Sequence, residues 1–119
     1  MAAPNIVAVT TIIGKTAVQA VTTSATAIVS NSAGSNKVFK INSLTIANVD
    51  GTNSADVTVD VFRSSVAYRL AFTIAVPADA TLVVISKDNA IYLEEDDSLR
   101  CTASANGDLE AVCSYEEIS

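Results

Sequence analysis

The chain has 119 residues, the length of one domain, and half of them are hydrophobic. Only 5% are aromatic and tryptophan is absent, so β-branched and small side chains make up most of the apolar content. Because β-branched side chains suit pleated strands better than helices, the composition predicts an all-β protein. The net charge of −6 and the scattered lysines and arginines argue against binding to nucleic acid or to an anionic membrane surface.

Two absences narrow the chemistry that we expect. The chain has no histidine, the commonest general base and metal ligand, so we expect no enzyme and no cofactor. No basic residues precede the apolar N-terminal stretch, so we expect no secretion signal and no membrane span. Synthesis in a reducing cytoplasm then predicts that Cys101 and Cys113 are buried free thiols and not a disulfide.

The first third of the chain predicts short strands separated by polar breaks. We expect a nearly continuous apolar strand from Ile6 to Ile13 that Gly14 ends, and a weaker strand from Ala17 to Val21. Extended structure resumes from Thr26 to Ser30. A loop over 31–36 follows, since its residues all favour turns.

The stretch from Val38 to Asn48 carries a change of phase. Its apolar side chains occupy odd positions before Asn42 and even positions after Ser43. Because side chains alternate between the two faces of a strand, this switch predicts a bulge, a bend or a strand that changes sheets.

The middle of the chain holds the clearest alternation. A turn over 49–54 leads into an alternating strand over 57–62, and Ser64-Ser65 separates it from the next strand. The continuous apolar run over 82–85 predicts a strand that is covered on both faces. In the strand that follows Ser64-Ser65, one face is expected to carry Tyr68, Leu70, Phe72, Ile74 and Val76.

The end of the chain predicts a hairpin. The apolar sets over 99–103 and 109–115 face one core together if Cys101 lies opposite Cys113, which a three-residue loop, Asn106-Gly107-Asp108, allows. With about eight short strands and turns at intervals of 8–12 residues, we expect an antiparallel two-sheet sandwich, jelly-roll-like, in a single domain over 1–119.

An acidic run, Glu94, Glu95, Asp96 and Asp97, is the most conspicuous polar cluster. Its carboxylates suggest calcium binding or a carboxylate pair for glycoside hydrolysis. The alternative is a solvated turn in which Asp97 or Ser98 bonds its own backbone. We favour the turn, because no spacing matches a calcium loop. Similarly, Tyr68, Tyr92 and Tyr115 suggest a sugar site, although core or rim packing is the simpler interpretation.

Four segments carry a family resemblance: KVFKINSLTIANVDGTNSADVTV (37–59), VPADATLVVISKD (76–88), IYLEEDDSLR (91–100) and ANGDLEAVCSYEEIS (105–119). Together they resemble a family of small virion structural proteins of tailed phages that infect marine cyanobacteria. Asp96 stands where similar chains carry glycine. The resemblance implies a non-enzymatic particle protein and brings no catalytic residues with it.

We therefore expect a capsid decoration or cement protein of a bacteriophage virion. It would be made in the host cytoplasm and dock on the major capsid protein or other virion proteins as a homo-oligomer, with a trimer favoured. One alternative is a neck, tail or fibre component. An alternative of another class is a carbohydrate-binding module that attaches the virion to a host-surface glycan.

The first 25 residues have two interpretations. They are apolar and separate from the main alternating block, so they suit an N-terminal arm that adds a strand to a neighbouring subunit. Equally, they suit an edge strand of the chain's own sandwich. The candidate partner-contact residues in this stretch are Ile6, Val7, Val9, Ile12 and Ile13.

Overall fold

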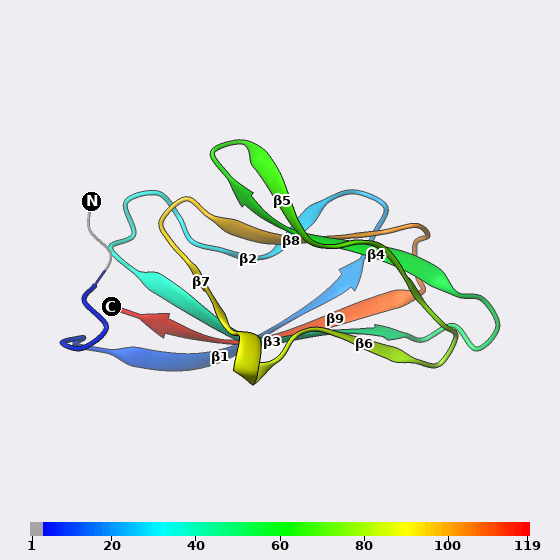
Figure 1. Cartoon of the computed structure of the whole chain (residues 1–119), viewed down its shortest axis with the longest axis horizontal. Helices are drawn as coiled ribbons and strands as arrows, with labels where there is room; N and C mark the ends of the chain where they lie inside the picture. The colour runs from blue at the N-terminus through cyan, green and yellow to red at the C-terminus, as the bar shows by residue number, and fades with distance from the viewer. Residues whose placement is uncertain (1–3) are drawn as a thin grey trace.

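Nine antiparallel strands form two facing sheets in the computed structural model, which describes residues 4–119 (Figure 1). Within those residues the one helical element is a short 3₁₀ turn, η1 (Lys87–Asn89), and no helix has the length and hydrophobicity needed to cross a membrane. The strands are β1 (Ile12–Val21), β2 (Thr26–Ser30), β3 (Val38–Asn48), β4 (Ala55–Arg63), β5 (Val66–Val76), β6 (Thr81–Ile85), β7 (Ile91–Leu93), β8 (Ser98–Ala103) and β9 (Leu109–Ile118).

The two antiparallel sheets confirm the predicted sandwich, and their strand order, which the sequence did not predict, is that of a jelly roll. One sheet runs β1-β9-β3-β6, with β7 also paired to β3, and the other runs β2-β8-β4-β5. Strands from the two halves of the chain therefore pair as β1 with β9, β2 with β8, β3 with β6, and β4 with β5. This is a long antiparallel hairpin rolled into two layers, which are the upper and lower layers of Figure 1.

The core lies between the two sheets and is built almost entirely from aliphatic side chains. The longest buried side chains come from the central strands, and β3 alone contributes Ile41, Leu44 and Ile46. Burial of such side chains removes apolar surface from water, which is the main stabilising contribution to folding.

The phase switch in β3 is a bulge, which confirms the prediction. The pairing of β3 with β9 shifts register between Ile41 and Ser43. On the other side of β3, β7 pairs with residues 39–41 before the bulge and β6 pairs with residues 44–47 after it. The bulge therefore lies where β3 changes its neighbour.

The predicted terminal hairpin is wrong. Strand β8 lies in the four-stranded sheet and β9 in the five-stranded sheet, so Cys101 is not the cross-strand neighbour of Cys113. In a jelly roll the chain passes from one sheet to the other between these strands. Both apolar sets still face the core, but they meet across it. Alternation determines which face is buried and does not determine the neighbouring strand.

The N-terminal region also differs from the prediction. A single strand, β1, replaces the two expected strands, and it passes through Gly14, which pairs with Glu116. The edge-strand interpretation therefore holds for residues 12–21. Before β1 the chain makes a turn, in which the N–H of Ala8 donates to the carbonyl of Asn5 at 2.9 Å. The expected arm also includes residues 1–3, which lie outside the described residues.

Strand β5 breaks the alternation expected of it. Its pairing with β4 shifts register twice, between Val57 and Val59 and between Val59 and Asp60. As a result Ala71 lies opposite the buried Val59, although the pattern placed it on the other face. The run over 82–85 is likewise covered on one face only, since Val83 of β6 is 57% exposed.

Candidate functional site

The acidic run forms a turn that is joined to a neighbouring strand by an arginine. The Asp97 side chain is buried, and its two oxygens accept hydrogen bonds from Nε and a terminal nitrogen of Arg63, the last residue of β4. The backbone N–H of Glu94 donates to the same carboxylate at 2.8 Å. Asp97 thus connects the β7–β8 turn to the end of β4, and the predicted bond to its own turn's backbone is present.

The environment of Asp97 keeps it ionised. Burial by itself would raise the pKa of this carboxyl, but the hydrogen bonds from Arg63 and from the Glu94 N–H outweigh burial and lower it. The hydrogen bond to Asp97 correspondingly raises the pKa of Arg63. The carboxylate is therefore engaged as the acceptor of a charge-assisted pair.

Of the other three carboxylates in the run, only Glu94 lies near Asp97, because one terminal nitrogen of Arg63 is bonded to both. A carboxylate oxygen of Glu94 lies 3.0 Å from a terminal nitrogen of Arg63, and Glu95 accepts a hydrogen bond from the backbone N–H of Asn36. Asp96 has a φ of 70°, in the left-handed region that glycine adopts most easily. Across residues 4–119 no group of three histidine, cysteine or acidic side chains is placed to hold a metal ion. Calcium binding stays a prediction without a converging set of ligands.

The two cysteines are free thiols within the core. Burial raises the pKa of each thiol to about 12, and the neighbouring Cys113 adds to the effect at Cys101. A thiol with such a pKa is almost fully protonated near neutral pH and is a weak nucleophile. Both cysteines contribute to the core as small apolar side chains.

The five candidate partner-contact residues fall into two groups, one before β1 and one within it. Ile6 and Val7 lie in the turn before β1, where Val7 is 90% exposed, and Val9 is half-buried. Ile12 and Ile13 belong to β1 and pair with Ile118 and Glu117 of β9. Their side chains remain exposed, so their role as partner contacts stays a prediction.

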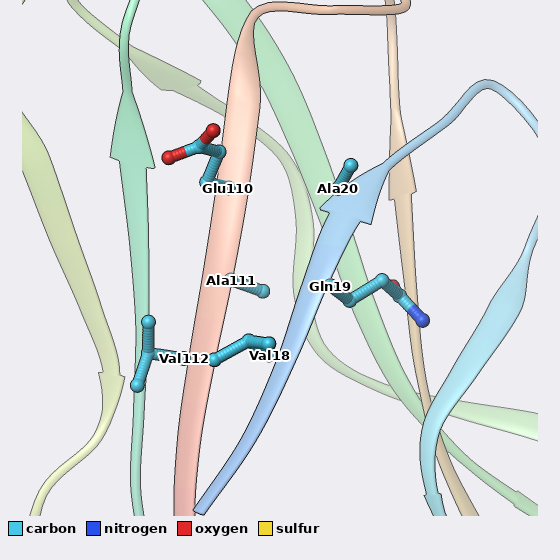
Figure 2. A pocket seen from close by; sticks show the side chains of 6 residues that line it. All are labelled: Val18, Gln19, Ala20, Glu110, Ala111 and Val112. Atoms are coloured by element: carbon cyan, nitrogen blue, oxygen red, sulfur yellow. The ribbon is translucent and has the colours of Figure 1, made fainter.

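At one edge of the sandwich the two sheets come into contact without pairing their backbones. Strand β1 of one sheet lies beside β2 of the other, and the Gln19 amide nitrogen donates to the carbonyl of Ala27 at 3.0 Å. Figure 2 shows Gln19 pointing away from β9, while Val18 and Val112 lie at a shallow hollow of about 350 Å³ between β1 and β9. Val18 and Val112 pair across the two strands and are both exposed on the outer face of the sheet.

At the opposite edge, which β5 and β6 form, a cleft opens between the sheets. Strand β5 pairs on one side only, with β4, and the end of the β4–β5 hairpin projects at the top of Figure 1. Where β4 and β5 face β7, a cleft of about 390 Å³ remains between the sheets. The side chains around it are mainly apolar: Val61, Arg63, Tyr68, Leu70, Ile91 and Tyr92.

Strand β5 carries several large exposed hydrophobic side chains, and its bulges divide them between two faces. Tyr68 and Leu70 line the cleft, whereas Phe72 lies beside Arg69 on the outer face. Single exposed apolar side chains are common on protein surfaces, but several large ones together mark an interaction site or an aggregation hazard. Half of the chain's six aromatic residues, Tyr68, Phe72 and Tyr92, are exposed on β5 or on β7 beside it. The exposed large side chains of β5 itself are Val66, Tyr68, Leu70, Phe72 and Ile74.

The tyrosines predicted as a possible sugar site are only partly brought together. Tyr68 and Tyr92 line the same cleft, whereas Tyr115 packs against Phe39 with ring centroids 5.7 Å apart. Sequence reasoning also missed Arg63, which borders this cleft and binds Asp97. A lone arginine at the end of a strand gave no signal of either role.

The sequence matches no protein-family model, and no curated protein matches it. The phage resemblance therefore remains a proposal.

Proposed function

We propose that this protein is a non-enzymatic structural subunit of a phage virion, and that it decorates or cements the capsid as a homo-oligomer. The observation that carries this proposal is the apolar surface. At least fourteen large hydrophobic side chains within residues 4–119 are exposed. They lie in the N-terminal turn, in the β3–β4 loop and on β1, β5, β6, β7 and β9. A monomeric protein seldom leaves this much large apolar surface in water, whereas a subunit buries it on assembly.

The architecture is compatible with that role. A jelly roll covers one face of each sheet by packing the two sheets over one core, and the same fold serves in viral capsid proteins and in lectins. Fold alone does not identify function, so the weight of the proposal rests on the exposed surface and on the sequence resemblance.

Copy number in purified particles tests the proposal. Quantitative mass spectrometry should find the protein in hundreds of copies per virion if it decorates the capsid. Six or twelve copies would instead indicate the neck or tail, the alternative within the same class. Complete absence of the protein from washed particles would refute both.

A carbohydrate-binding module is the second candidate, and one observation favours it. Tyr68 and Tyr92 share the open cleft with Arg63, so two aromatic rings and a guanidinium stand where a sugar could stack and accept hydrogen bonds. Glycan-array binding that disappears in Tyr92→Ala and survives in Tyr115→Phe would support this candidate. An array without any binding would remove it.

A further inference from the structure

We propose that Asn106 is a site of spontaneous deamidation, at which the backbone nitrogen of Gly107 attacks the side-chain amide and an aspartate or isoaspartate replaces the asparagine. The site lies in the β8–β9 loop, where the chain passes from one sheet to the other. The proposal concerns the covalent chemistry of the chain itself, so it does not depend on the virion role.

The reaction needs only water besides the chain. The Gly107 nitrogen forms a bond to Cγ of Asn106, and Nδ2 leaves as ammonia together with the proton that the Gly107 nitrogen loses. The product is a succinimide ring. Water then opens the ring at one of its two carbonyl carbons and returns a proton to the ring nitrogen. One opening gives aspartate, and the other gives isoaspartate, in which the backbone runs through the former side chain.

The residue that follows an asparagine controls this attack. Glycine favours it, because glycine places no side chain beside the attacking nitrogen and lets the backbone take unusual angles. The chain has eight asparagines, and Asn106 is the one that precedes a glycine. Asn31, Asn42 and Asn53 precede serine and provide the comparison within the same chain.

The fold leaves the reacting groups accessible. Asn106 and Gly107 are both exposed in a turn, where Gly107 has a φ of 86° and open space around its Cα. Within residues 4–119 the N–H of Gly107 donates to no protein acceptor, so no protein hydrogen bond has to break before this nitrogen reacts. Asn106 Oδ1 accepts one hydrogen bond, from the N–H of Thr23 at 3.0 Å. This donor faces the oxygen on which negative charge develops during the attack, and it leaves Nδ2 free to depart.

Hydrogen bonds on either side hold the rest of the loop in place. The N–H of Ala103 donates to the carbonyl of Thr22 at 2.8 Å, and the N–H of Val49 donates to the carbonyl of Asp108 at 2.8 Å. The tip of the loop between these two anchors can therefore change its backbone angles while β8 and β9 stay folded. Such local freedom is what the ring closure requires.

Two of the comparison asparagines are held through the nitrogen that would have to leave. Asn31 is buried, and its Nδ2 donates to the carbonyls of Lys37 and Leu93. Asn53 is exposed, but its Nδ2 donates to the carboxylate of Asp50. Asn53 is therefore the matched exposed control, and Asn31 is the buried one.

The aspartate that precedes a glycine, Asp50 before Gly51, is protected in another way. The same ring could form there with loss of water, but only from the protonated acid. Hydrogen bonds from the backbone N–H groups of Thr52 and Asn53 lower the pKa of Asp50 and keep it as a carboxylate, which is a poor target for a nucleophile. The structure thus singles out Asn106 among the candidate sites.

The modification changes both the charge and the contacts of this end of the sandwich. It adds one negative charge to a chain of net charge −6, in a loop whose Asp108 already lies close to Asp50. Isoaspartate also lengthens the backbone of the turn by one carbon atom and shortens the side chain. The hydrogen bond from Thr23, which links the β1–β2 loop to the β8–β9 loop, is then lost.

The test is incubation of the purified full chain at mildly alkaline pH in water enriched in heavy oxygen, followed by digestion in ordinary water and peptide mapping by mass spectrometry. Heavy oxygen enters when the ring opens, so its presence identifies deamidation that took place in the folded protein. Asn106 should convert at least tenfold faster than Asn53 and Asn31, with isoaspartate as the larger product. Asn106→Gln should abolish the label in this peptide, because the longer side chain closes a ring much more slowly.

A second incubation in guanidinium separates the effect of the fold from that of the sequence. Unfolding should accelerate Asn31 much more than Asn106, because Asn106 is already accessible in the folded chain. Circular dichroism confirms that the Asn106→Gln variant is folded.

Three outcomes would overturn the proposal. These are an Asn106 that keeps its amide while Asn53 converts, equal rates for the two residues, and an acceleration of Asn106 on unfolding as large as that of Asn31. None of them bears on the presence of the protein in particles, so failure here is distinct from failure of the virion role.

Discussion

Strands β9 and β5 show that hydrophobic content does not determine burial in this protein. Strand β9 carries three glutamates, yet its inward side chains Leu109, Ala111 and Cys113 are fully buried. Strand β5 carries one charge and is the more hydrophobic of the two, yet most of its large side chains are exposed. The difference lies in their positions. Strand β9 is flanked by β1 and β3 and covered by the opposite sheet, whereas β5 is an edge strand with β4 as its one neighbour in the sheet.

The comparison has a functional consequence. The subunit role that we propose needs a rigid core and a separate apolar surface for assembly to cover. The central strands form such a core, and β5 carries exposed apolar side chains. The predictions below test whether the two regions contribute to stability as differently as their positions imply.

The largest difference is expected between two leucines. Leu44→Ala in β3 removes a fully buried side chain and should lower the free energy of unfolding by about 2–5 kcal/mol. Leu70→Ala in β5 removes a side chain that is 43% exposed and should cost less than about 1 kcal/mol at concentrations where the chain is monomeric. Chemical denaturation measures both. Equal costs would mean that β5 is buried within the monomer.

The next effect concerns the ion pair that fixes the end of β4, next to β5. Arg63→Ala leaves the Asp97 carboxylate buried without its main partner. We expect a loss of about 2 kcal/mol, below the value for a fully buried pair because Arg63 is half-exposed. Arg69→Ala is the matched control in β5 and should cost less than about 0.5 kcal/mol. An Arg63 variant as stable as the control would show that water replaces the pair.

The same pair predicts a dependence on pH. The folded pKa of Asp97 is lowered, so its contribution to stability is complete above the unfolded value of about 4 and is lost as the pH falls through the lower folded value. Wild type should therefore lose stability below pH 4 more steeply than Asp97→Asn. Parallel curves for the two proteins would contradict this assignment.

A smaller and opposite effect is expected at the turn that carries β5. Ser64 and Ser65 have φ angles of 51° and 62°, the geometry of a two-residue hairpin turn that favours Asn-Gly. The double substitution Ser64→Asn, Ser65→Gly should raise the free energy of unfolding by about 0.5–1 kcal/mol. Ser24→Gly is the control, since Ser24 has no such backbone angle, and it should be neutral or destabilising. A destabilised double variant would mean that the serine side chains stabilise the turn.

The smallest effect is expected at Asp96. Its φ of 70° lies in the left-handed region, which glycine adopts most easily. Asp96→Gly should stabilise the protein by a few tenths of a kcal/mol, and Asp96→Ala should destabilise it, because aspartate tolerates this conformation better than alanine. Thermal melting of the two variants compares them directly, and a lower melting temperature for the glycine variant would contradict the argument.

Most of the fold could be predicted from local pattern. The period of two and the turn residues predict the strand segments, and the change of phase at Asn42 predicts the bulge in β3. The neighbours of each strand were harder to predict from the sequence. The patterns in β8 and β9 fit a hairpin as well as two facing sheets, because an inward face is the same whether its partner lies beside it or across the core.

The candidate site, too, was only partly predictable from the sequence. The acidic turn could be recognised from four consecutive acidic residues. Its arginine partner, however, lies 34 positions before Asp97, and no sequence spacing connects the two residues. Tyr68 and Tyr92 come from strands in different sheets, and only the open edge brings them to one cleft.

The sequence by itself determined that this chain is a β-sandwich with free thiols in its core, because side-chain type and alternation act locally along each strand. Only the tertiary structure decided which apolar strand is covered. Burial depends on how many neighbours a strand has and on what lies across from it, and both follow from the order in which the sheets assemble. The clearest apolar alternation of the sequence therefore belongs to an edge strand, β5, whose large side chains are mostly exposed.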